Sequence, residues 1–145
     1  MKLKLTFDSK KIMFAVVAII LPILSWEIAH YLGITSNFLN GNYPNPFLLL
    51  VVSPLFEEVV FRGLIQSIIL KYIKSIPLGV ILVNVLFTLF HWIHFTSPFY
   101  LAGVFVSGII FSMTKIYFKH LRYPVILHSY YNFIFYAYNF LNHLI

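Results

Sequence analysis

The sequence contains no cysteine, and only 10% of its residues are charged. The absence of cysteine excludes a disulfide framework, a thiol nucleophile and a zinc site built from thiolates. The scarcity of charge, set beside 61% hydrophobic residues, lies far outside the composition of soluble globular proteins. The composition therefore predicts an integral membrane protein.

Acidic residues are scarcer than basic ones, since four Asp and Glu stand against ten Lys and Arg and give a formal net charge of +6. Such an excess suits either nucleic acid or anionic lipid. The cations stand beside apolar segments and do not form one basic surface, so they indicate membrane topology, and we expect no nucleic-acid partner. The only aspartate, Asp8, precedes the first apolar run, which excludes a pair of catalytic aspartates within the membrane.

Five apolar segments are each long enough to cross a bilayer as a helix. Turn residues and helix-starting pairs such as Asn45-Pro46 and Ser97-Pro98 separate them. The first segment lacks a cleavage site and is predicted to be retained. We therefore expect an all-α, polytopic membrane helical bundle of about five transmembrane helices in one membrane-embedded domain, residues 1–145, with segments at residues 12–31, 47–70, 76–95, 98–118 and 124–145.

The cations also predict the orientation. Every Lys and Arg except Arg62 falls in the N-terminal arm, the second-to-third turn or the fourth-to-fifth turn, and these three places lie on one side of a five-span protein. The positive-inside rule then predicts a multi-pass protein of the cell membrane with a cytoplasmic N-terminus and an external C-terminus. Trp26 and Trp92 fall near the outer ends of their segments, as interfacial aromatic residues do.

Three charged residues interrupt the second apolar segment. Glu57 lies ten residues after Phe47, at roughly 15 Å by helical rise and therefore near mid-membrane. An ionised group there costs at least ~2.5 kcal/mol and marks a functional site by default. Glu58 and Arg62 are four residues apart and can neutralise each other, whereas Glu57 points about 100° away without a local partner. A purely structural ion pair would need one acidic residue for each basic residue. Glu57 is the spare acidic residue and is therefore predicted to be the general base.

Two further pairs lie four residues apart and share a helix face: Phe87 with His91, and His128 with Asn132. A single membrane histidine is more often a packed polar residue than a catalyst, and we expect His94 to be interfacial. Straight helices would place His91 and His128 about 15 Å apart in depth. Either the turn at residues 119–124 is recessed, or the third helix sits deeper than its apolar limits, or the two histidines share no site.

Taken in order, Glu-Glu-x-x-x-Arg, Phe-x-x-x-His and His-x-x-x-Asn resemble the motifs of the CPBP family, the CAAX-protease and bacteriocin-processing intramembrane proteases. The resemblance covers residues 47–145, which would be a four-helix protease core, and leaves residues 1–46 as an N-terminal helix and loop. It implies an endopeptidase that hydrolyses a peptide or lipid-anchored substrate, in bacteriocin or peptide processing or in self-immunity. Glu57 would activate water, Glu58 and Arg62 would brace the helix, His91 would orient the water, and His128 with Asn132 would stabilise the oxyanion.

Two alternatives remain open at this stage. Glu57, His91 and His128 are also suitable ligands for zinc or another divalent metal, although a glutamate-activated water without metal would use the same residues and the sequence has no His-Glu-x-x-His motif. A non-enzymatic membrane immunity or peptide-binding protein is the alternative function. Ser107 with His128 makes a poor serine–histidine pair, and Ser107-Gly108 is better explained as a close helix contact.

Overall fold

The computed structural model describes residues 8–31, 44–93 and 97–144, and within these ranges it contains helices and no strand. This confirms the predicted all-α fold class. The chain divides into two compact units, residues 1–36 and 37–145, which are described separately. The predicted division at residue 46 stays a prediction. His94 and most of the first loop, residues 32–43, lie outside the described residues.

The first unit contains one helix, α1 (Ser9–Tyr31), which is long and apolar enough to cross a membrane. The helix begins at Ser9, three residues before the predicted apolar segment, because Asp8 caps it. The Asp8 carboxylate accepts the backbone N–H of Lys10 at 3.1 Å, and its Oδ2 lies 3.7 Å from Lys11 Nζ. A side-chain acceptor at this position satisfies a backbone donor that the helix itself cannot.

The second unit begins with a long helix whose hydrogen-bond pattern changes along its length. Its successive parts are η1 (Leu48–Val52), α2 (Ser53–Glu58), η2 (Val59–Ile65) and α3 (Gln66–Tyr72), and the two η parts are π-helical. At the end of η1 the backbone N–H of Ser53 bonds to Leu48 O, five residues back. The next residue, Pro54, has no N–H to donate, and the wider π turn before it accommodates its ring. The predicted single helix is therefore continuous but irregular.

Three more helices complete the second unit: α4 (Ile76–Trp92), α5 (Pro98–Phe118) and α6 (Arg122–Leu144). The bounds of α5 agree with the sequence prediction, because Ser97 caps its start by accepting Tyr100 N–H at 3.5 Å and Lys119 ends it in the left-handed region at φ 59°. The prediction for the third span was too long, since α4 ends at Trp92. By length and composition α5 is the second described helix fit to cross a membrane.

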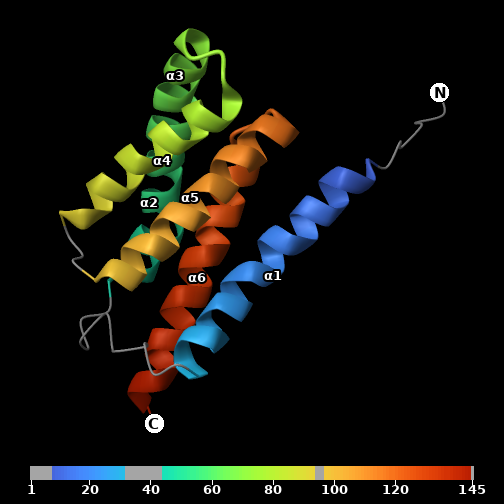
Figure 1. Ribbon diagram of the computed structural model, residues 1–145. Coiled ribbons are helices and arrows are strands. Elements are labelled where there is room, and N and C mark those ends of the chain that lie inside the picture. Colours follow the sequence, from blue (N-terminus) through green and yellow to red (C-terminus); the bar gives the residue numbers. More distant parts are fainter. Residues whose placement is uncertain (1–7, 32–43, 94–96, 145) are drawn as a thin grey trace. The chain divides into compact units, whose positions relative to one another are not determined.

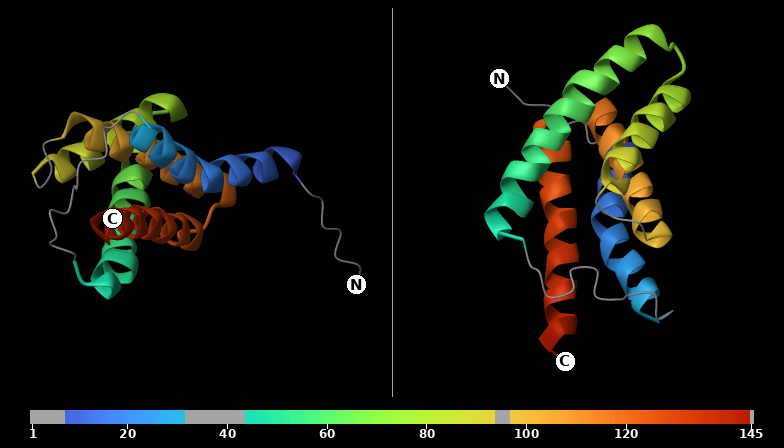
Figure 2. Two further views of the ribbon diagram at one scale, coloured as in Figure 1. Left: turned by 90° about the horizontal axis from the view of Figure 1, so that it is seen from below. Right: turned by 90° about the vertical axis from the view of Figure 1, so that its left-hand side faces the viewer.

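The helices of the second unit surround a polar centre. Helix α5 packs against α4 and α6, and α6 packs along η1 and α2, an arrangement that can be followed in Figures 1 and 2. The centre buries a group of polar and charged side chains, whereas large apolar side chains such as those of Leu86 and Leu89 are exposed on the outside. Soluble proteins have the opposite distribution, so the surface suits a lipid environment. The buried polar side chains are Glu57, Glu58, Arg62, Gln66, Asn84, Ser112, Thr114, His128 and Asn139.

Candidate active site

Three predicted site residues from three helices converge on one carboxylate oxygen. Glu57 Oε2 on α2 lies 3.6 Å from His91 Nε2 on α4 and 3.8 Å from His128 Nε2 on α6. The other carboxylate oxygen, Oε1, accepts a hydrogen bond from Ser53 Oγ, one helical turn earlier. Glu57 is only 8% exposed. Both Nε2 atoms are too far from Oε2 for a direct hydrogen bond, and polar groups at this separation are commonly bridged by water.

The other ring nitrogen of each histidine fixes its tautomer. His91 Nδ1 lies 2.9 Å from Phe87 O, and a carbonyl only accepts, so Nδ1 carries the hydrogen. His128 Nδ1 lies 2.8 Å from Glu58 Oε1 and donates to it in the same way. In the neutral imidazoles both Nε2 atoms therefore present lone pairs toward Glu57. Three acceptors face one point, which is an environment that attracts a hydrogen-bond donor such as water, or a cation.

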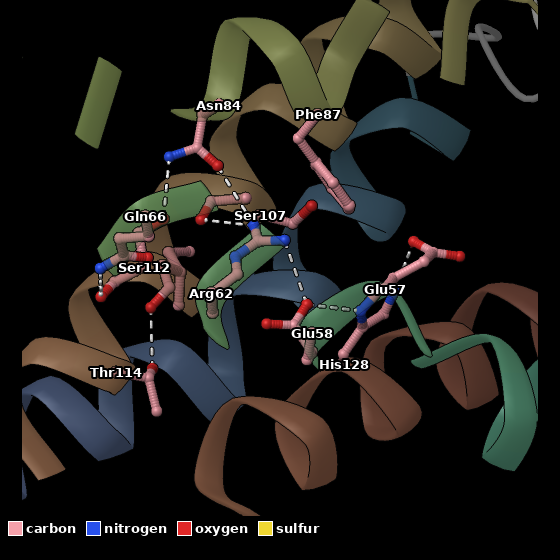
Figure 3. A network of polar contacts seen from close by, with 12 residues as sticks. Glu57, Glu58, Arg62, Gln66, Asn84, Phe87, Ser107, Ser112, Thr114 and His128 are labelled. Atoms are coloured by element: carbon pink, nitrogen blue, oxygen red, sulfur yellow. Dashed lines mark hydrogen bonds and ion pairs between the residues drawn. The ribbon is translucent and has the colours of Figure 1, made fainter. Parts of the chain in front are cut away.

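Glu58 and Arg62 form the ion pair that their spacing predicted. Arg62 Nη1 lies 3.2 Å from Glu58 Oε1, and both side chains are 0% exposed. The guanidinium also donates from Nη2 to Asn84 Oδ1 at 3.2 Å and to Gly108 O at 2.9 Å. Figure 3 shows Arg62 between Asn84 and Glu58, with His128 beyond the acid. The pair therefore connects η2 to α4 and α5, and His128, which contacts both Glu58 and Glu57, links the pair to the proposed base.

The contacts of Phe87 explain why the motif has an aromatic residue one helical turn before His91. Its carbonyl holds His91 Nδ1, while its ring lies 4.2 Å from the Arg62 guanidinium carbon and 4.5 Å from the His91 ring. A cation over an aromatic face is stabilised when both are withdrawn from water. Phe111 covers the other side of the site by stacking on His128, with ring centroids 4.7 Å apart.

The family comparison matches this part of the chain. A model of the family described as type II CAAX prenyl endopeptidase Rce1-like matches residues 40–134, a range that includes all three motifs. The chain belongs to this family. No curated protein and no solved structure matches it. The predicted CPBP membership is thus confirmed, and the chain is a membrane protein of an intramembrane CAAX-type endopeptidase family.

The Rce1-like fold also brings together the two histidines that straight helices would separate. In Figure 1 and in the right-hand view of Figure 2, the turn between α5 and α6 lies nearer the middle of the bundle than the turn between α3 and α4. Helix α4 runs obliquely past it. His128, which follows this recessed turn by less than two helical turns, therefore reaches the same level as His91 near the end of α4. Such a turn is allowed where protein covers its backbone.

Asn132 makes a different contact from the one expected. Its Nδ2 donates to Leu49 O at 2.9 Å, so it fastens α6 to the π-helical part η1. The carbonyls of a π segment are displaced from the regular helical ladder, and this one gains a side-chain donor. The role of Asn132 in oxyanion binding stays a prediction that would depend on its second amide hydrogen.

Sequence reasoning missed several residues that hold Arg62 in place. Asn84 Nδ2 donates to Val80 O at 2.7 Å and to Ser112 Oγ at 3.1 Å, and Gln66 Nε2 donates to Ser112 O at 3.2 Å. A signal was present, because uncharged polar residues inside apolar spans usually face the protein interior. Gly108 is also required, since a Cβ there would lie 2.4 Å from Asn84 Oδ1. Ser107 donates to Val104 O and so serves its own helix.

The fit of a metal ion to the Rce1-like site can be judged from the donor set. Neutral imidazoles and a carboxylate are suitable ligands for zinc, and the Nδ1 partners of both histidines resemble the outer-shell contacts of metal ligands. The atoms that would hold such an ion are Glu57 Oε2, His91 Nε2 and His128 Nε2. A metal held there would polarise a bound water, and we derive no step through it.

Proposed function

We propose that this Rce1-like protein is an intramembrane endopeptidase in which Glu57 is the general base. The observation that carries the proposal is the position of Glu57 Oε2 between His91 Nε2 and His128 Nε2. A water bound among these three acceptors can direct its two hydrogens to two of them and its oxygen toward a substrate carbonyl. Arg62 is paired with Glu58. The Glu57 carboxylate is therefore left available to act as the base.

The proposed reaction is hydrolysis of a peptide bond. Glu57 takes one proton from water, and the resulting hydroxide attacks the carbonyl carbon to form a tetrahedral oxyanion. When the carbon–nitrogen bond breaks, the same proton passes to the leaving amine. His91 orients the water. His128 donates from Nε2 to the oxyanion when it carries a second proton, taken from bulk water before the reaction and returned after product release, while Glu58 stabilises this imidazolium at Nδ1. The second amide hydrogen of Asn132 is the other candidate donor.

We propose a substrate that is itself held in the bilayer, either a lipid-anchored protein or a membrane-active peptide. The buried, mid-helix position of Glu57 supports this, because a soluble loop would not reach a carboxylate that is 8% exposed. The family description favours a prenylated protein. Bacteriocin or signalling-peptide processing, with or without self-immunity, is the more specific function that we propose.

We also propose a multi-pass topology with a cytoplasmic N-terminus. Lys71 lies in the last turn of α3 and Lys74 in the connection after it, while Lys119 ends α5 and Arg122 begins α6. Figure 1 shows both turns toward the same end of the second unit, as a positive cytoplasmic face requires.

Cleavage in heavy-oxygen water tests the endopeptidase proposal. We expect the purified full chain in liposomes to cut a farnesylated or an unmodified hydrophobic peptide and to incorporate one heavy oxygen into the new carboxyl group. His91→Ala should reduce the rate because the water loses an orienting acceptor. Comparison of the two peptides assigns the substrate class. Binding of a peptide without cleavage would instead establish the non-enzymatic immunity or peptide-binding function.

The same assay addresses metal dependence. We propose that Glu57 activates water without a metal, with zinc or another divalent ion as the alternative, and we expect activity to survive a chelator in protein that elemental analysis finds nearly metal-free. The opposite result would be stoichiometric zinc that a chelator removes together with activity, followed by recovery of activity when zinc is returned. This result would contradict the proposal and assign Glu57, His91 and His128 as ligands.

A further inference from the structure

A cavity of about 240 Å³ lies on the other side of Arg62 from the candidate active site. It is formed where the long helix and α5 run toward the lysine-bearing end of the second unit. Its lining does not include Glu57, His91 or His128, so it is separate from the proposed hydrolytic site. The lining residues are Arg62, Gln66, Ser67, Leu70, Lys115, Ile116 and Lys119.

The lining is cationic and contains no acid. Lys119 is exposed at the opening, Lys115 is half-buried on the wall, and Arg62 and Gln66 are buried at 0% and 2% exposure. Two buried polar atoms of these last residues, Arg62 Nε and Gln66 Oε1, have no hydrogen-bond partner within the described residues. Buried polar atoms normally have partners, so a donor and an acceptor are available to a bound molecule here.

These features specify the chemistry of the occupant. Lysine ammonium groups and a guanidinium N–H bind phosphate oxygens, and the unpaired Gln66 Oε1 accepts from a hydroxyl group. Leu70 and Ile116 give the same cavity an apolar wall, which suits an acyl chain. The ligand is therefore an amphiphile that carries a phosphate and a hydroxyl-bearing head group.

We propose that this cavity binds the head group of an anionic phospholipid of the phosphatidylglycerol type. Its position supports a lipid source over a soluble one, because the opening lies beside the turns that carry the basic residues, where a membrane surface supplies anionic head groups. Basic pockets between transmembrane helices on the cytoplasmic side are known to hold such lipids. The proposal concerns binding alone and does not depend on Glu57 or on hydrolysis.

Lipid titration of the purified full chain in detergent micelles tests the proposal. Phosphatidylglycerol should bind more tightly than zwitterionic phosphatidylcholine and should raise the thermal unfolding midpoint. Lys115→Gln with Lys119→Asn should weaken phosphatidylglycerol binding at least about tenfold. Asparagine is chosen because Lys119 has φ 59°, a conformation that asparagine tolerates. Lys115→Gln alone, with a smaller loss, is the second variant should the double variant unfold.

The matched control is Lys71→Gln with Lys74→Asn, which removes the same charge from the same end of the unit without touching the cavity. This control should bind phosphatidylglycerol as the wild type does. Equal losses in the two double variants would overturn the proposal, because binding would then reflect general surface charge. Displacement of the lipid by equimolar inorganic phosphate would overturn the lipid assignment in favour of a soluble phosphate. Equal affinity of the wild type for the two lipids would overturn it as well.

Discussion

Glu57→Gln should abolish peptide cleavage while the protein remains folded. Glutamine has the same shape as glutamate, and its Oε1 can still accept the hydrogen bond from Ser53 Oγ that glutamate accepts. An amide cannot take a proton from water, however, so the loss should be that of a general base, about 10²–10⁴-fold in kcat. The measurement is the cleavage rate in liposomes at matched protein, with the unfolding midpoint recorded for each preparation.

Glu27→Gln is the matched control for this substitution. It removes another of the four acidic residues, and it does so from α1, outside the three motifs. We expect it to cleave at the wild-type rate. Cleavage by Glu57→Gln at the wild-type rate would remove Glu57 from the mechanism, and a large drop in the unfolding midpoint of that variant would assign Glu57 a structural role instead.

Arg62→Leu should have the largest effect on stability. The guanidinium lies 3.2 Å from Glu58 Oε1 and donates to Asn84 Oδ1 and Gly108 O. Its removal leaves a buried carboxylate whose only remaining charged or polar contact in the described residues is His128 Nδ1 at 2.8 Å. An uncompensated buried charge costs roughly 3–5 kcal/mol. We expect much lower abundance in membranes and a lower unfolding midpoint in detergent.

The double variant Glu58→Gln with Arg62→Leu separates the charge effect from lost packing. Glutamine at position 58 is neutral and its Oε1 can still accept from His128 Nδ1, so the double variant should be more stable than Arg62→Leu alone. If Arg62→Leu kept normal abundance and midpoint but lost all cleavage, Arg62 would act in the reaction itself.

Local rules were sufficient to predict the Glu58–Arg62 pair and the start of α5, whereas the convergence of Glu57, His91 and His128 was expected only from the resemblance to the CPBP motifs. Glu58 and Arg62 could be predicted to pair, because residues four apart share a helix face and charges at mid-membrane are stabilised by a partner. The start of α5 followed from Ser97-Pro98, where a capping hydroxyl and a fixed proline φ coincide. For the same reason Asn45 could be recognised at the start of the second span, where its Oδ1 accepts Phe47 N–H at 2.9 Å.

Local rules did not predict how deep each residue lies in the bundle or which residues of other helices it contacts. Helical rise measured from apolar limits assumes that the turns at one end of the bundle lie at one level, whereas the turn between α5 and α6 lies nearer the middle of the second unit than the turn between α3 and α4. The two π segments around Glu57 and Glu58 change which side chains face inward, and Pro54 alone does not signal both of them. The contacts of Gln66 and Asn84 depend on Ser112, 46 and 28 residues away in the chain, a pairing that no local pattern encodes.

The two bonds from α6 to the long helix determine how a substrate can arrive. His128 reaches Glu58, and one turn later Asn132 reaches Leu49 O, so the seam between these helices is fastened at two levels. Of the three side chains that meet at this point, that of His91 on α4 is the most exposed, at 14% of its side-chain surface, against 10% for the Glu57 side chain and 6% for the His128 side chain. We therefore expect a substrate to reach Glu57 from the side of His91 on α4 and not through the seam along α6.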